Sequence, residues 1–253
     1  MIQLLKKFPG SWGGKWLCGA GWLLAALLSV WAAPRIYHRL ISPRPDIQKE
    51  NWNQKLAEKK QELSTPWRDQ RPLIILAGDS QVEFGDLYDL FAGGWAVRNC
   101  GLAGAKIADV TQLVSAIGDR HPRLVLLMCG INNLGARESR EACLRDYEVL
   151  LETIRSQLQP EAILVLSVMP VRESAVDRAS RQINQNVKLF NTELAARCRE
   201  RRVDFLNVDS AVADNAGGLA AGLTTDGLHL NAEGYRRLAG IVAPRLPEPV
   251  NAP

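Results

Sequence analysis

The sequence is poor in cysteine and histidine, with five cysteines and three histidines in 253 residues. It has no Cys-x-x-Cys pair and no cluster of His and Cys, which argues against a structural zinc site and a disulfide-rich scaffold. Repeats and low-complexity stretches are also absent, and 47% hydrophobic with 23% charged residues is typical of a globular chain. We therefore predict one sizeable folded domain with an appendage, and expect neither a metal nor an organic cofactor.

Positive charge is unevenly distributed along the chain. Residues 1–34 carry three lysines and no acidic residue, residues 35–71 carry nine basic against five acidic residues, and residues 72–253 carry 19 basic against 22 acidic residues. A nucleic-acid-binding domain would need a basic stripe on its own folded surface. A basic segment beside an apolar one is instead typical of contact with anionic lipid head groups. We therefore predict no nucleic-acid partner.

A run of 18 residues without charge, residues 16–33, lies near the N-terminus. As a helix it would be about 27 Å long, against about 30 Å for the hydrocarbon core of a bilayer. Trp12, Trp16 and Trp31 lie near its ends, where indole rings favour the membrane interface. We predict a single-pass transmembrane anchor after a cationic tail at 1–15, with a cleaved signal peptide or a buried helix as alternatives. The tail favours a cytoplasmic N-terminus and an extracytoplasmic main domain.

A basic juxtamembrane linker is predicted at residues 34–71. The sequence Ser-Pro-Arg-Pro at 42–45 would end a preceding helix. Residues 46–63 are rich in helix formers, with Asp46 as a candidate N-cap and only a loose apolar stripe. This pattern predicts a solvated spacer helix, and a helix on the membrane surface or in a dimer contact is the alternative.

From residue 72 to 253, short apolar runs alternate with longer helical patterns. The runs of Val, Ile and Leu do not alternate with polar residues, which indicates strands covered on both faces. We predict an α/β domain, a three-layer α/β/α sandwich around a parallel sheet, with function at the carboxyl ends of its strands. The expected strands are 73–77, 96–99, 124–129, 162–168 and 203–206, and the expected helices are 105–117, 140–158, 181–202 and 232–242.

Glycines and polar residues follow three of these strands. Gly78-Asp79-Ser80 comes directly after the first strand and would place Ser80 at the start of a helix. Gly101 follows the second strand, and Asn132 follows the third, where its amide could donate into the same crevice. A capping serine, a turn glycine and an Asn-Asn turn would each explain one of these motifs taken alone.

The histidines leave one candidate general base. His38 lies beside the apolar run and His121 precedes a proline in a helix-to-strand turn, so both are interpreted as incidental. His229 has Asp226 three residues before it, close enough to orient one ring nitrogen while the other faces a nucleophile. This is the arrangement that nucleophilic catalysis by a serine needs.

These four stretches, in this order, resemble the blocks of the SGNH or GDSL hydrolase family over residues 72–243. The matching residues are Gly78, Asp79, Ser80, Gly101, Gly130, Asn132, Asp226 and His229. The resemblance implies a flavodoxin-like fold with Ser80 as nucleophile, His229 as general base and then acid, and Asp226 as the orienting carboxylate. It also implies an oxyanion hole formed by the N–H groups of Ser80 and Gly101 and by the side-chain amide of Asn132.

Two residues depart from the family pattern. Gln81 stands where the family often has leucine, and we assign it no role because it is outside the triad. Asn133 replaces the usual aspartate after Asn132, which would alter how Asn132 is held and weaken activity. Asp79 is interpreted as structural, and Cys100 and Cys129 as small strand residues. The α/β-hydrolase alternative lacks support because no Gly-x-Ser-x-Gly motif occurs.

The sequence as a whole predicts a membrane-anchored serine esterase that hydrolyses short acyl or acetyl esters through an acyl-enzyme. Residues 171–186, polar and rich in arginine, are the expected loop over the site, and would suit a carbohydrate ester or a lysophospholipid head group. Two alternatives remain. One is an acyltransferase that uses the same serine on a sugar or lipid hydroxyl, and the other is a non-catalytic binding module on the same fold.

Overall fold

A computed structural model describes residues 45–85, 94–118, 120–173 and 178–248. The predicted anchor at 16–33 and the cationic tail at 1–15 lie outside the described residues. Within the described ranges, no helix is both long enough and apolar enough to cross a bilayer. The membrane anchor therefore stays a prediction from sequence.

A five-stranded, fully parallel sheet forms the middle of the domain, in the order β2-β1-β3-β4-β5. β1, β3 and β4 are buried runs of aliphatic residues, as the sequence indicated, whereas β2 includes polar residues and β5 is only partly buried. β1 lies between β2 and β3. Their bounds are β1 Leu73–Gly78, β2 Ala96–Gly101, β3 Leu124–Met128, β4 Ala162–Leu166 and β5 Asp204–Leu206. Because all five run the same way, the residues that follow them gather at one edge of the sheet.

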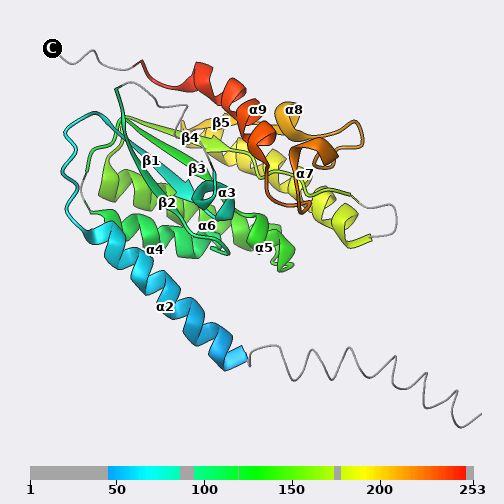
Figure 1. The fold of residues 1–253 in the computed structure, drawn as a ribbon, viewed down its shortest axis with the longest axis horizontal. Coiled ribbons are helices and arrows are strands. Elements are labelled where there is room, and N and C mark those ends of the chain that lie inside the picture. The colour runs from blue at the N-terminus through cyan, green and yellow to red at the C-terminus, as the bar shows by residue number, and fades with distance from the viewer. Residues whose placement is uncertain (1–44, 86–93, 119, 174–177, 249–253) are drawn as a thin grey trace, which may run out of the picture. The chain divides into compact units, whose positions relative to one another are not determined.

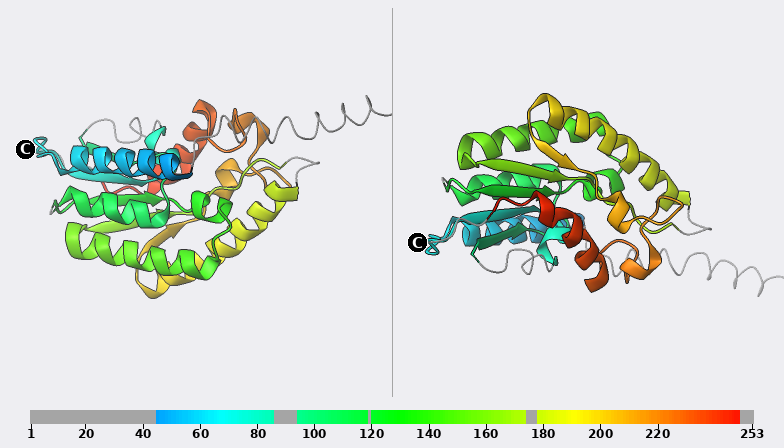
Figure 2. Two further views of the ribbon diagram at one scale, coloured as in Figure 1. Left: turned by 90° about the horizontal axis from the view of Figure 1, so that it is seen from below. Right: turned by 90° about the horizontal axis from the view of Figure 1, so that it is seen from above.

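Helices cover both faces of the sheet, which gives the predicted three layers (Figures 1 and 2). One face carries α4 (Ile107–Ile117), α6 (Arg140–Thr153), which continues into a turn of π-helix, and α7 (Arg178–Glu200). The other face carries α9 (Ala232–Val242) and the short α8 (Asp209–Val212). On that second face, Leu238 and Val242 of α9 pack with strand residues such as Leu76 in one fully buried core.

Short helical turns complete the edge of the sheet where the strands end. The turn α3 (Ser80–Glu83) follows β1 and α5 (Ile131–Gly135) follows β3. The turn η3 (Ala221–Leu223) lies before the loop of Asp226 and His229. A further turn outside this set, η4 (Ala243–Arg245), follows α9. Each predicted catalytic residue therefore lies in or beside one of these short elements.

The linker helix α2 spans Pro45–Ser64. It differs from the prediction in where it begins and in how its second half is packed. It begins at Pro45, so Asp46 lies inside the helix rather than at its N-cap. A compact unit of the chain begins at Gln54, and from there α2 belongs to it: Leu63 is fully buried. The side chain of Arg98 in β2 donates a 2.5 Å hydrogen bond to the carbonyl oxygen of Leu63. This half of the helix is therefore packed on the domain and is not a solvated spacer.

Candidate active site

Ser80 is held at the start of α3 by a very tight turn after β1. A Cβ atom added to Gly78 would lie 2.1 Å from the carbonyl oxygen of Met128, so only glycine fits there. The carboxylate of Asp79 accepts a hydrogen bond from the N–H of Gln81 at 3.0 Å and caps α3. Burial raises the pKa of Asp79 to about 6, against the opposing effect of hydrogen bonds from the N–H groups of Gln81 and Gly130. Asp79 thus has the structural role expected of it.

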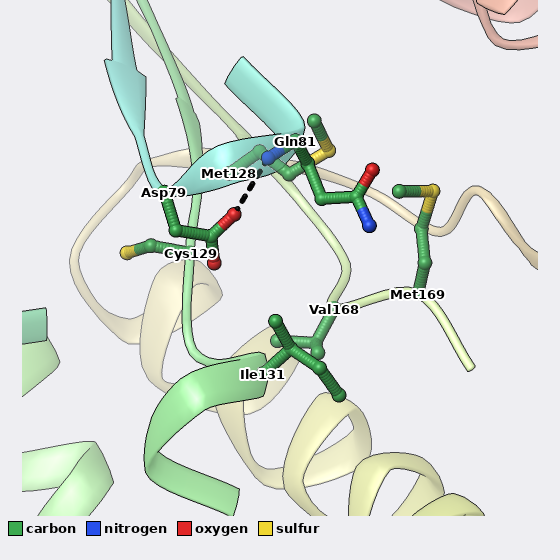
Figure 3. A pocket seen from close by; sticks show the side chains of 7 residues that line it. All are labelled: Asp79, Gln81, Met128, Cys129, Ile131, Val168 and Met169. Carbon is green, nitrogen blue, oxygen red and sulfur yellow. Dashed lines mark hydrogen bonds between the residues drawn. The ribbon is translucent and has the colours of Figure 1, made fainter. Parts of the chain in front are cut away.

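The space beneath this turn is nearly filled by side chains (Figure 3). The cavity left there is about 10 Å³, which is at the lower limit for one water molecule. Figure 3 shows the carboxylate of Asp79 bonded to the backbone of Gln81, whose side chain points away from it toward Met169. The lining residues are Asp79, Gln81, Met128, Cys129, Ile131, Val168 and Met169. A turn supported in this way has little room to shift.

The structure brings Ser80, His229 and Asp226 into one hydrogen-bonded chain. The distance from Ser80 Oγ to His229 Nε2 is 2.9 Å, and that from His229 Nδ1 to Asp226 Oδ2 is 2.5 Å. The other carboxylate oxygen of Asp226 accepts from the N–H groups of Leu228 and His229 at 2.9 and 2.8 Å. The His229 side chain, followed by these backbone donors, holds the pKa of Asp226 well below its usual range. Asp226 is therefore ionised over the whole neutral range.

The loop that carries His229 is fixed on two sides. Gly227 has a φ of +86°, and its N–H donates to Thr224 Oγ1 at 2.9 Å. Its carbonyl oxygen accepts from the N–H of Arg172 at 2.8 Å, which ties the loop to the segment after β4. The ring of Phe84, whose exposed fraction is 60%, lies edge-on to His229 with 5.7 Å between ring centroids. Phe84 therefore forms an apolar rim beside the histidine, which the sequence did not reveal.

Gly101 has a different role from the one that the resemblance implied. Its N–H donates to Asn99 Oδ1 at 2.8 Å, so this N–H already has an acceptor. A Cβ atom at Gly101 would lie 2.3 Å from the backbone nitrogen of Glu83, so glycine is needed here for close packing against α3. The prediction of Gly101 as an oxyanion donor is therefore corrected.

Gly104, three residues further on, has a backbone N–H without an acceptor among the described residues, so it is available for that task. Its φ is +89°, and it is exposed. The next residue, Ala105, accepts a 2.9 Å hydrogen bond from Asn132 Nδ2, which places the Asn132 amide beside this loop. The sequence contains a signal for it, because Gly-Leu-Ala-Gly at 101–104 has two glycines, of which the resemblance implied the first.

Asn133, the departure from the family pattern, points toward α4 rather than toward the catalytic edge. It is fully buried, accepts from the N–H of Ile107 at 3.0 Å and donates to Glu138 Oε2 at 2.6 Å. Glu138 is also paired with Lys106 at 2.6 Å. The residue thus fixes the start of α4 and has Glu138 as its acceptor, so an amide rather than a carboxylate suits this position.

Asn133→Asp is expected to lower the free energy of unfolding by about 1–2 kcal/mol at pH 7.5, because a donor is lost and two carboxylates come into contact. Lys106, and then Asn133, hold the pKa of Glu138 below its usual value. The substitution reverses the second effect, so the deficit should shrink at pH 4.5, where one carboxyl takes up a proton. Urea unfolding at both pH values measures this. The double variant Asn133→Asp/Glu138→Gln should recover most of the loss, and an unchanged single variant at pH 7.5 would contradict the assignment.

A cavity of about 400 Å³ opens between the Asn132 side and the His229 loop. Apolar side chains from three segments contribute most of its lining, and Arg172 is one of its polar lining residues. The lining residues are Ile131, Asn132, Gly135, Val171, Arg172, Ala179, Ser180, Ile183, Asp226, Gly227 and Leu228. The expected loop at 171–186 does border the site, but its second half is the first part of α7, which begins at Arg178, and its contribution to the wall is largely apolar.

Two asparagines of α7, seven residues apart, hold the segment after β4. Asn191 accepts from the N–H of Val168 and donates to its carbonyl oxygen, at 2.9 and 2.8 Å. Asn184 bonds to both backbone groups of Val171 in the same way, at 2.8 Å each. Because α-helical residues at this spacing share a face, the two side chains act together. They fix the wall of the cavity, and neither was recognised in the sequence.

The two cysteines near the site are buried and protonated. Burial raises the pKa of Cys100 to about 12 and raises that of Cys129 as well. Neither thiol is a nucleophile at neutral pH, which agrees with their interpretation as small apolar residues. In the described part of the chain, no group of three or more His, Cys, Asp or Glu side chains is placed to hold a metal ion.

The fold and the site indicate the class of protein, and a comparison with known proteins identifies its family. A parallel α/β sandwich with a serine, a histidine and an aspartate joined at the strand ends is the architecture of a hydrolase. Residues 75–237 match the model of the GDSL-like lipase/acylhydrolase family. The chain belongs to this family and is a hydrolase that acts on ester bonds, which confirms the resemblance seen in the sequence. No match was found among curated proteins.

Solved structures share the fold at low sequence identity. A protein of Streptococcus pneumonia has a TM-score of 0.69 and 23% identity, over 81% of this chain and 99% of that one. A GDSL-like lipase of Bacteroides thetaiotaomicron has a TM-score of 0.60 and 18% identity, over 76% and 95% of the two chains. A carbohydrate acetylesterase family member of Sinorhizobium meliloti has a TM-score of 0.53 and 18% identity, over 69% and 96%.

Proposed function

We propose that this chain is a serine esterase that cleaves carboxylic esters through a covalent acyl-enzyme on Ser80. The observation that carries the proposal is the hydrogen-bonded chain from Ser80 Oγ through His229 to the Asp226 carboxylate. A serine hydroxyl is a poor nucleophile unless a base removes its proton as it attacks. His229 Nε2, 2.9 Å away, is placed to do so. Asp226 holds the ring in the orientation and tautomer that leave Nε2 unprotonated.

The reaction proceeds in two halves. Ser80 Oγ attacks the ester carbonyl carbon while its proton moves to His229 Nε2, and the carbonyl oxygen becomes an oxyanion. The tetrahedral intermediate collapses as the bond to the alcohol oxygen breaks, and His229 gives that oxygen the proton. A water molecule then attacks the acyl carbon in the same manner. The products are the alcohol and the free acid, with Ser80 regenerated.

The oxyanion is stabilised by three donors from three strand ends. These are the N–H of Ser80, the N–H of Gly104 and the side-chain amide of Asn132. The N–H groups of Ser80 and Gly104 have no acceptor among the described residues, and Asn132 uses only one of its two amide hydrogens, on Ala105. Donors that are fixed before the reaction stabilise developing charge without reorganising.

The substrate is an ester whose acyl group enters the 400 Å³ cavity. Ile131, Val171 and Ile183 give that cavity an apolar wall directly beside Asn132, and Phe84 adds an apolar surface next to His229. The wall favours an alkyl acyl group over a charged one. The similarity to a carbohydrate acetylesterase family member is consistent with a carbohydrate as the alcohol.

A fluorophosphonate probe tests the nucleophile directly. The purified protein should be labelled at one serine, and Ser80→Ala should abolish labelling, because the probe reacts only with a serine activated by a base. Ser115→Ala is the matched control, since Ser115 is an exposed serine of α4 whose hydroxyl bonds to its own helix, and this variant should be labelled like the natural protein. A folded natural protein that does not react would favour the binding-module alternative.

A further inference from the structure

Gln81, the residue after the nucleophile, is hydrogen-bonded to Leu228, the residue before the base. It follows Ser80 directly, its side chain is buried with 4% exposed, and its Nε2 donates to the carbonyl oxygen of Leu228 at 2.7 Å. Leu228 directly precedes His229. The two residues are 147 positions apart in the chain, so this bond connects the β1–α3 turn to the loop before α9.

The same peptide unit also reaches the catalytic carboxylate. The carbonyl oxygen of Leu228 accepts from Gln81, and the N–H of that peptide, which belongs to His229, donates to Asp226 Oδ1 at 2.8 Å. Hydrogen bonds in series polarise one another, so the bond from Gln81 strengthens the N–H donation to Asp226. The peptide is held at both ends, and a rotation of this peptide, which would shift the backbone of His229, would break both bonds.

Tyr235 of α9 fixes Gln81 in turn. Its hydroxyl, on a side chain with 6% exposed, donates to the backbone carbonyl of Gln81 at 2.9 Å and lies 3.4 Å from Gln81 Oε1. The carbonyl oxygen of Leu228 fixes the orientation of the Gln81 amide, because the flipped amide would set Oε1 against that oxygen. The donor therefore faces Leu228.

We propose that Gln81 is a positioning residue that sets the distance between Ser80 Oγ and His229 Nε2 by bonding to the Leu228 peptide. The inference rests on the proposed function. A leucine of similar volume would fill the same buried space and could not donate a hydrogen bond. The packing of Gln81 and its effect on catalysis can therefore be separated.

Gln81→Leu is the test, with hydrolysis of p-nitrophenyl butyrate by the full chain as the assay. We expect kcat to fall about 10-fold or more, since small displacements of a catalytic group are costly, with KM within about 2-fold. The rate of fluorophosphonate labelling should fall by the same factor, and the thermal midpoint should stay close to that of the natural protein. Gln70→Leu, at an exposed glutamine outside the site, is the matched control and should leave kcat unchanged.

Gln81→Glu gives a readout that packing alone would not move. A protonated carboxyl still donates to the Leu228 carbonyl, whereas a carboxylate repels it, so kcat relative to the natural protein should fall as the pH rises. If Gln81→Leu does not fold, the pH dependence of kcat for Gln81→Glu tests the proposal in its place. A kcat for folded Gln81→Leu within 2-fold of the natural value, or a flat ratio for Gln81→Glu, would overturn the inference. An inactive natural protein would instead overturn the proposed function itself.

Discussion

Replacing His229 by alanine is expected to lower kcat for ester hydrolysis about 10⁵- to 10⁶-fold. Among the described residues, Ser80 Oγ has its hydrogen-bond partner in His229 Nε2, at 2.9 Å, and the same nitrogen must return a proton to the leaving alcohol. Steady-state hydrolysis of p-nitrophenyl butyrate measures the change. The fold should be retained, because the side chain is partly exposed and lies at the edge of the core.

His121 provides the matched control for this prediction. It lies outside the site, in the turn before β3, and has a φ of +43°, so asparagine is a better replacement than alanine at this backbone conformation. His121→Asn should keep kcat within about 2-fold of the natural value. A His229→Ala protein that kept more than a tenth of the natural kcat would show that another group removes the proton.

Asn132→Ala is expected to lower kcat about 100- to 1,000-fold, with little change in KM. The amide donates one hydrogen to the carbonyl oxygen of Ala105, and its other hydrogen is free for the oxyanion. An interaction made mainly in the transition state affects kcat more than ground-state binding. Affinity for a boronic acid, which forms a tetrahedral adduct with the serine, should fall in parallel with kcat.

The control for Asn132 is an asparagine of the same chain outside the machinery. Asn186 of α7 is half-buried, and Asn186→Ala should leave kcat within about 2-fold of the natural value. A kcat for Asn132→Ala within 5-fold of the natural value would remove the side-chain amide from the oxyanion hole. The backbone N–H groups of Ser80 and Gly104 would then have to carry the stabilisation alone.

The sheet and its covering helices could be predicted closely because local patterns specify them. The aliphatic runs at 73–77 and 124–129 became β1 and β3, since strands buried on both faces need apolar residues at every position. The helix expected at 232–242 is α9 with the same bounds, because its apolar residues repeat at the helical period. Burial of the linker from Gln54 on was not predicted, because its few apolar residues gave no sign of what they pack against.

The choice between Gly101 and Gly104 shows where sequence reasoning failed at the site. Both are glycines after β2, and the sequence cannot tell which N–H is free. Only the folded chain brings Asn99 Oδ1 to Gly101 and the backbone of Glu83 against its α-carbon. The role of Gln81 was missed for a similar reason, since its partner Leu228 lies 147 residues away.

Local patterns in the amino-acid sequence were enough to predict the α/β class and the order of the strands along the chain, and they named Ser80, Asp226 and His229 as candidate reactive residues. The class and the strand order follow from periodicity, and His229 with Asp226 from the few residue types able to act as a general base, whereas Ser80 as the nucleophile is what the resemblance to the SGNH or GDSL family implied. Only the folded chain shows which backbone N–H groups already have an acceptor. It also shows that Asn133 bonds to Glu138 and to the N–H of Ile107 in α4, and that Gln81 and Tyr235 hold the His229 loop. The physical reason is that a hydrogen bond depends on distances of tenths of an ångström between groups that are remote in sequence, and only packing sets those distances.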